Sequence, residues 1–75
     1  MRLLAFGRLS HLPIGGLTIP PEIVDSSGLR NWLAERWPEF SDSNVRLAVN
    51  QVLIRDDISL SMDDEIAFLP PMSGG

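Results

Sequence analysis

The sequence predicts an α+β fold in which one helix covers one face of a small mixed sheet. Two observations lead to this prediction. Only one segment, residues 27–37, carries apolar side chains at helical spacing, whereas several apolar runs elsewhere have the length of short strands. Proline and glycine interrupt the chain between these runs. One amphipathic helix is enough to cover one face of such a sheet.

The first part of the chain is predicted to contain two strands joined by a turn. Residues 3–6 form an apolar run typical of a strand, and residues 11–16 are glycine-rich turn material. Residues 17–19 are predicted to be a second strand that ends at Pro20 and Pro21, because proline has no N–H for a sheet ladder. We expect these two strands to form a hairpin.

The helix is predicted over residues 27–37, after three consecutive candidates for its N-cap: Asp25, Ser26 and Ser27. Its apolar stripe consists of Leu29, Trp32, Leu33 and Trp37. We expect both tryptophans to anchor the helix in the core rather than to bind a partner. Pro38 is predicted to end the helix, because the residue before a proline is pushed out of the α region.

The second part of the chain is predicted to hold three more strands, at residues 45–49, 52–54 and 65–69. A polar loop is expected before them, at residues 40–44. Asn50 and Gln51 are predicted to form a tight turn, since asparagine tolerates a positive φ. The segment before the last strand is expected to be irregular, with Ile58 and Leu60 as inward anchors.

This order of elements indicates a β-grasp fold, in which the first and last strands lie parallel and side by side at the centre of the sheet. We expect one domain over residues 1–69 and a flexible tail over residues 70–75. Two prolines stiffen the start of this tail, and two glycines leave its end without side chains. Such a tail can thread a narrow channel and place the Gly75 carboxylate in another enzyme's active site. The alternative is a frayed end without a function.

The composition argues against several classes of function. Ten acidic residues outnumber six scattered arginines, lysine is absent and the net charge is −4, so we expect no nucleic-acid binding. The chain has no cysteine for a disulfide or a thiolate metal site. No apolar run reaches the ~18 residues that cross a bilayer, so we expect no membrane span and a cytoplasmic location. The isolated His11 and the acidic pairs Asp56-Asp57 and Asp63-Asp64 are expected to be solvated, not metal ligands.

Strand alternation predicts a surface for a protein partner. The side chains expected to face the helix are Leu3, Ala5, Leu47, Ile66 and Phe68. The opposite face would then carry Leu4, Phe6, Ala48, Ala67 and Leu69, with Leu53 nearby. An exposed apolar face on a small acidic protein usually marks a protein interface. The alternative is the ordinary exposure of scattered apolar residues.

Four segments, spread over the chain in order, carry a resemblance to a known family: residues 6–9 (FGRL), 33–38 (LAERWP), 47–51 (LAVNQ) and 64–75 (DEIAFLPPMSGG). On these residues the chain resembles the MoaD/ThiS family of ubiquitin-like sulfur carriers. The last segment is the specific one. Its double proline before Gly-Gly is more similar to the molybdopterin synthase small subunits than to the thiamin-pathway carriers. The chain departs from the family pattern at Asp63, often a glycine, and at Met72, usually a β-branched residue.

The resemblance implies a β-grasp sulfur carrier that acts as the non-catalytic sulfur-donor subunit of molybdopterin synthase. A ubiquitin-activating-like adenylyltransferase would use ATP to adenylate Gly75, and a sulfur donor of the cysteine desulfurase or rhodanese type would convert it to a thiocarboxylate. The large catalytic subunit, in a heterotetramer, would receive the tail. The sulfur would build the dithiolene of molybdopterin on a cyclic pterin precursor. The chain itself would bind no cofactor and no metal.

The resemblance also implies the site residues. Gly75 would react, with Gly74 beside it, and a larger side chain at either position should clash in the channel. The partner-binding residues would be the tail residues Pro70, Pro71, Met72 and Ser73, together with residues of the surface that strand alternation predicts: Phe6, Leu53, Ala67 and Leu69. Three alternatives stay open: a ubiquitin-like modifier that forms amide links, a sulfur carrier for another pathway such as thiamin thiazole, and a binding module with an inert tail.

Overall fold

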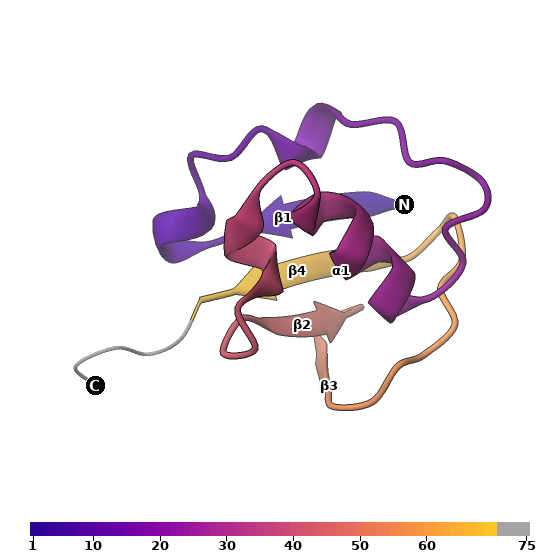
Figure 1. Ribbon diagram of the computed structural model, residues 1–75. Coiled ribbons are helices and arrows are strands. Elements are labelled where there is room, and N and C mark those ends of the chain that lie inside the picture. The colour runs from indigo at the N-terminus through magenta and orange to yellow at the C-terminus, as the bar shows by residue number, and fades with distance from the viewer. Residues whose placement is uncertain (71–75) are drawn as a thin grey trace.

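Figure 1 shows the computed structural model of the chain, which describes residues 1–70. Within these residues the regular elements are β1 (Arg2–Ala5), α1 (Ser26–Ala34), β2 (Arg46–Val49), β3 (Val52–Ile54) and β4 (Glu65–Leu69). Short 3-10 helices lie in the connections: η1 (Gly7–Leu9), η2 (Ile14–Gly16) and η3 (Pro38–Ser41). The predicted tail residues Pro71, Met72, Ser73, Gly74 and Gly75 lie outside the described residues.

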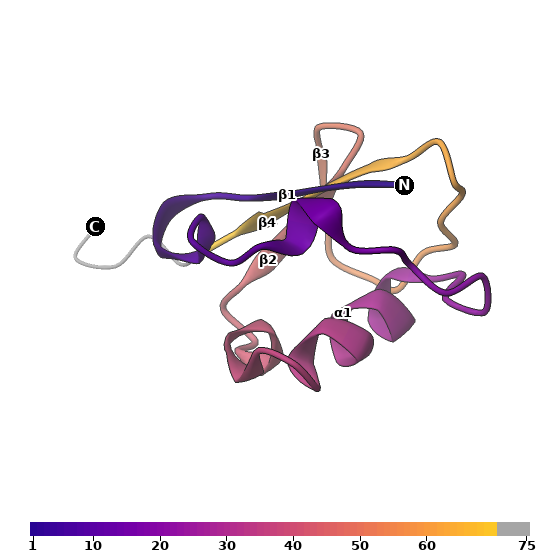
Figure 2. The ribbon, with the colours of Figure 1, turned by 90° about the horizontal axis from the view of Figure 1, so that it is seen from above.

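The strands form one mixed sheet in the order β1-β4-β2-β3, and α1 packs on one of its faces (Figure 2). β1 and β4 are parallel, with Leu3 opposite Ile66, and β2 is antiparallel to both β4 and β3. This is the predicted β-grasp arrangement, with the first and last strands paired. One part of the prediction is wrong, because β4 is an inner strand whereas β1 lies at the edge of the described sheet.

The strand predicted at residues 17–19 does not form within the described part of the chain, so the predicted hairpin is wrong. After β1, backbone N–H groups donate instead to carbonyls that lie a few residues earlier in the chain. Ile14 is buried at the start of η2, and its carbonyl accepts a hydrogen bond from the N–H of Leu17 at 3.3 Å. Leu17 and Ile19 still pack against the core as half-buried side chains. The apolar pattern therefore predicted their burial but not their backbone pairing.

Helix α1 begins where the capping residues predicted it. Asp25 is the N-cap, and its carboxylate accepts a hydrogen bond from the N–H of Gly28 at 2.7 Å. Leu29 and Leu33 are fully buried against the sheet, one turn apart. None of the helices in residues 1–70 has the length and apolar character that a membrane crossing needs.

The end of the helix differs from the prediction. α1 ends at Ala34, three residues before the expected position, and Trp37 has an extended backbone (φ −129°, ψ 102°). Pro38 causes this, because it excludes Trp37 from the α region and opens η3 as its first residue. Trp37 and Trp32 are half buried and pack on the margin of the core, so they are not its central anchors.

The polar loop predicted at residues 40–44 contains a core residue. Phe40, in η3, has no exposed surface, and its ring meets that of Phe68 edge-on at a centroid distance of 5.0 Å. Trp37 also packs edge-on against Phe40, at a centroid distance of 6.3 Å. The prediction failed because a single aromatic residue among polar neighbours gives no periodic signal.

In the second half, β3 and β4 have the predicted bounds, and β2 begins at Arg46, one residue later than predicted. Asn50 and Gln51 have positive φ angles of 52° and 71° in the turn between β2 and β3. The Asn50 amide donates to the Asp64 carboxylate at 2.9 Å and fixes this turn beside the start of β4. Residues 55–62 are irregular, and Ile58 and Leu60 pack against the core as half-buried anchors.

Candidate functional site

The sheet face opposite α1 carries an apolar row that crosses every strand. The register places Leu4 beside Ala67, Ala67 beside Ala48, and Ala48 beside Leu53. Successive side chains of a strand point to opposite faces, so this row points away from the helix that Figure 2 shows beneath the sheet. We call these four residues, with the adjoining Phe6 and Leu69, the outer apolar face.

Burial agrees with the predicted division between the two faces. The helix-facing residues Leu3, Leu47, Ile66 and Phe68 are at most 5% exposed. On the outer apolar face, Leu53 is 53% exposed and Phe6 is 47% exposed. Leu4, Ala67 and Leu69 are half buried, and Ala48 is covered by its neighbours. The prediction that these residues line the face away from the helix is confirmed.

Charged side chains border the outer apolar face at both ends of the strands. At one end Arg2 lies opposite Glu65, with their charged groups 3.9 Å apart, and both belong to the outward-pointing set. At the other end the exposed Arg46 lies opposite Leu69, the last residue of β4. A surface with apolar residues in the middle and charged residues at the rim is typical of protein interfaces.

The chain leaves the sheet at Pro70, next to η1. Pro70 is half buried, and η1 contacts the end of β4. Figure 1 shows η1 at the same end of the sheet as the C-terminal end of β4. The only predicted tail residue that the structure describes is therefore Pro70, and it lies at the border of the outer apolar face.

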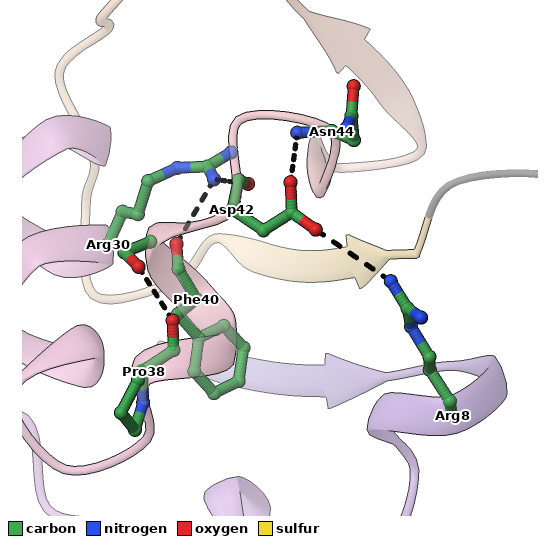
Figure 3. A network of polar contacts seen from close by, with 7 residues as sticks. Arg8, Arg30, Pro38, Phe40, Asp42 and Asn44 are labelled. Carbon is green, nitrogen blue, oxygen red and sulfur yellow. Dashed lines mark hydrogen bonds and ion pairs between the residues drawn. The ribbon is translucent and has the colours of Figure 1, made fainter.

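A polar network holds the loop beside this exit in place (Figure 3). The Arg30 guanidinium, from α1, donates to the carbonyls of Phe40 at 3.2 Å, of Asp42 at 3.0 Å, and of Val45. Burial lowers the pKa of Arg30, and the nearby Asp42 carboxylate partly opposes this effect. One side chain thus satisfies three carbonyls of the segment that leads from η3 into β2.

The same loop is linked to η1. The Asp42 carboxylate lies 3.7 Å from the Arg8 guanidinium and also accepts a hydrogen bond from the N–H of Asn44 at 2.9 Å (Figure 3). Both charged partners of the ion pair are exposed to solvent, so it contributes little to stability by itself. Its geometric effect is to connect η1 with the loop that leads into β2.

The acidic pairs have structural roles that their spacing did not reveal. The Asp57 carboxylate accepts hydrogen bonds from the Ser27 N–H at 2.8 Å and the Ser26 hydroxyl at 2.9 Å. The Asp64 carboxylate accepts from the Ser61 N–H at 2.8 Å and from the Asn50 amide. These hydrogen bonds lower the pKa values of both aspartates. The bond from the backbone N–H has the largest effect in each case, and the bond from the side chain comes second.

No group of three or more histidine, aspartate or glutamate side chains within residues 1–70 is placed to hold a metal ion. A polar cleft of about 440 Å³ lies between the start of α1 and the strands β2 and β3, with Arg30, Arg46, Arg55, Asp56 and Asp57 among its lining residues. Its charges are mixed, and the Arg30 and Asp57 side chains in it are already held by hydrogen bonds. The cleft therefore gives no better candidate than the outer apolar face and the exit at Pro70.

Comparison with known proteins relates the chain to a protein family and to a characterised relative. The model of the ThiS family matches residues 6–75, which is nearly the whole chain and includes the final Gly74-Gly75. Over 43 residues the chain is 42% identical to the molybdopterin synthase sulfur carrier subunit of Escherichia coli (strain K12). This alignment covers 56% of the chain and 53% of the relative, so the chain matches about half the length of that protein.

Proposed function

The chain belongs to the ThiS family, and from this membership we propose that it is a sulfur carrier, the small subunit of a molybdopterin synthase. The observation that supports the proposal most directly is the extent of the family match, which runs through Gly75. The similarity to the Escherichia coli sulfur carrier subunit favours the molybdopterin pathway. The β-grasp domain would present the tail, and the chemistry would take place at the Gly75 carboxylate.

In the proposed cycle, an adenylyltransferase resembling ubiquitin-activating enzymes activates the Gly75 carboxylate with ATP. A carboxylate is a poor acyl donor, and the adenylate supplies the leaving group that it lacks. The persulfide of a cysteine desulfurase or a rhodanese-type donor then displaces AMP to form an acyl disulfide, and a thiol reductant cleaves this disulfide to leave the thiocarboxylate. The large subunit of the synthase accepts the tail and uses this sulfur to build the dithiolene on a cyclic pterin precursor.

The residues of the chain fit a carrier that contributes position rather than acid–base catalysis. Gly74 and Gly75 have no side chains, so backbone donors of a partner enzyme can approach their carbonyl and carboxylate oxygens closely. Pro70 and Pro71 restrict the backbone at the start of the tail. The outer apolar face adjoins the exit at Pro70, so a partner docked there would receive the tail directly.

The proposal is tested by removing the reactive residue while leaving the fold intact. We expect that deletion of Gly75, or the substitution Gly74→Val, abolishes sulfur transfer to the large subunit and leaves thermal unfolding unchanged. The unfolding measurement is the control, because these residues lie beyond the last strand. Full sulfur transfer by the truncated chain would refute the proposal.

Mass spectrometry of the unaltered chain, incubated with the adenylyltransferase, ATP and the sulfur donor, separates the alternatives. Replacement of one Gly75 oxygen by sulfur, with transfer to the large subunit, supports the proposal. Amide adducts of Gly75 on other proteins would favour a ubiquitin-like modifier. A thiocarboxylate that the large subunit does not use would favour another pathway, such as thiamin thiazole synthesis.

A further inference from the structure

We propose that Gly7 is a positioning residue for the tail: its missing side chain makes room for the Pro70 ring, and this contact sets the direction in which the chain leaves β4. The inference rests on the proposed function, because direction matters only if Gly75 must reach a partner's active site. It adds a specific residue, far from Gly75 in the sequence, to the determinants of sulfur loading.

Two properties of Gly7 lead to this inference. Its φ is +58°, in the left-handed region that glycine adopts without strain. A Cβ atom built on Gly7 would lie 2.6 Å from Cγ of Pro70 and 3.5 Å from its Cδ. The first distance is far below van der Waals contact, so glycine suits the backbone conformation here and is needed for the space that it leaves.

The surroundings determine which of the two residues would move. Leu9, two residues after Gly7, is 1% exposed and anchors η1 in the core. On the other side, the N–H of Phe6 donates to the carbonyl of Phe68 at 3.2 Å and fixes the end of β1 against β4. Pro70 follows the last strand and is only half buried. A side chain at residue 7 would therefore displace Pro70 rather than η1.

Displacement of Pro70 changes the starting direction of the tail. Proline cannot rotate freely about φ, so a shift of its ring is passed on to the backbone that follows. Reactions between positioned groups are sensitive to such shifts, and a misplacement of about 1 Å can cost on the order of 100-fold in rate. We therefore expect the effect in the rate of Gly75 adenylation rather than in the affinity of the outer apolar face.

The test compares Gly7→Asn with Gly16→Asn in the full-length chain. Asparagine tolerates positive φ, so Gly7→Asn keeps the backbone conformation and adds mainly the contact with Pro70. Gly16 is the matched control, because a Cβ there would meet no heavy atom of the described residues within 4 Å. The measurements are thermal unfolding, affinity for the large subunit, and the rate of Gly75 adenylation at saturating adenylyltransferase.

We expect Gly7→Asn to lower the adenylation rate by roughly 10-fold or more. Its affinity for the large subunit should stay within about threefold of the unaltered chain, and its unfolding should follow that of Gly16→Asn. A second comparison tests the contact itself. In a Pro70→Ala background the ring is absent, so Gly7→Asn should cost much less there, which is the signature of two coupled residues.

The outcomes distinguish the two proposals. If the unaltered chain is not adenylated, the proposed function fails, and this inference fails with it. If the unaltered chain is adenylated and Gly7→Asn is adenylated equally fast, only the inference is overturned. Equal losses with and without the Pro70→Ala substitution would also overturn it, because the effect of residue 7 would then not pass through the Pro70 ring.

Discussion

Replacing Arg30 with methionine should destabilise the fold strongly without exposing any core side chain. The Arg30 guanidinium donates hydrogen bonds to the carbonyls of Phe40, Asp42 and Val45, which lie along the segment that leads from η3 into β2. Methionine keeps much of the aliphatic stem and removes the donors. The substitution therefore isolates the contribution of the hydrogen bonds from that of packing.

The magnitude follows from the number of bonds and their surroundings. A hydrogen bond from a charged donor contributes about 1.5–3 kcal/mol net, and the bonds are only partly buried, so water replaces part of each lost bond. The guanidinium also regains its hydration on unfolding, which reduces the net value. We expect a loss of roughly 2–3 kcal/mol from a total that is on the order of 4–11 kcal/mol for a domain of this size.

Chemical denaturation with urea, followed by tryptophan fluorescence, measures this loss directly. The slope of unfolding free energy against urea should be unchanged while the midpoint falls, since the same surface is exposed on unfolding. In thermal unfolding the midpoint should drop by roughly 10–20 °C. Arg36→Met is the control; the Arg36 guanidinium lies over the Trp32 ring, 4.4 Å from the ring centroid. Its loss should be about 0.5–1 kcal/mol. Equal losses for Arg30→Met and Arg36→Met would refute the reasoning.

Two further predictions concern the loss of folding stability at low pH and partner binding by the outer apolar face. The hydrogen bonds from Ser27 and Ser26 lower the pKa of Asp57 in the folded chain. The charged carboxylate therefore stabilises the fold at a pH above the aspartate pKa of the unfolded chain, which is about 3.9. This contribution to stability is lost as the pH falls through the pKa of the folded chain. Asp57→Asn should therefore lose less stability on acidification than the unaltered chain, and an identical pH dependence of stability in the two would contradict this. Leu53→Asp should weaken binding to the proposed partner, the large subunit, by roughly 10-fold or more, as measured by titration calorimetry. Val52→Asp, one residue away on the same strand but paired with Val49 on the helix-side face, should not, and equal effects of both substitutions would rule out the outer apolar face as the docking surface.

The sequence was sufficient to predict the elements whose signals are periodic or local. The bounds of β3 and β4 agree with the predicted ranges, and the Asp25 cap and the Asn50 turn were recognisable from residue type. The alternation along β4 also predicted which side chains face the helix, because a period of two permits only one assignment once Ile66 and Phe68 are placed in the core.

The errors arose where tertiary contacts overrule local preference. Leu17 and Ile19 are residue types that favour a strand. The preceding segment instead forms η2 around the buried Ile14, and within the described residues Leu17 and Ile19 do not pair with β1. Phe40 lies in a polar segment, and only its packing on Phe68 makes it a core residue. The part played by Gly7 depends on Pro70, at the other end of the domain, so no local pattern could reveal it.

Under the proposed function, strand β4 uses the same few residues for folding and for docking. Ile66 and Phe68 are fully buried against the helix layer, while Ala67 and Leu69 alternate with them on the outer apolar face. The small side chains of Ala67 and Ala48 form the middle of the row, between the larger Leu4 and Leu53. A partner side chain can therefore approach the backbone closely at the centre of the sheet and still find apolar contacts at its flanks.

Since Pro70 directly continues β4, a partner seated on this face is already beside the start of the tail. Under the proposed function, docking and delivery are coupled through one strand, and substitutions at odd-numbered positions of β4 should affect partner binding, while those at Ile66 and Phe68 should affect folding.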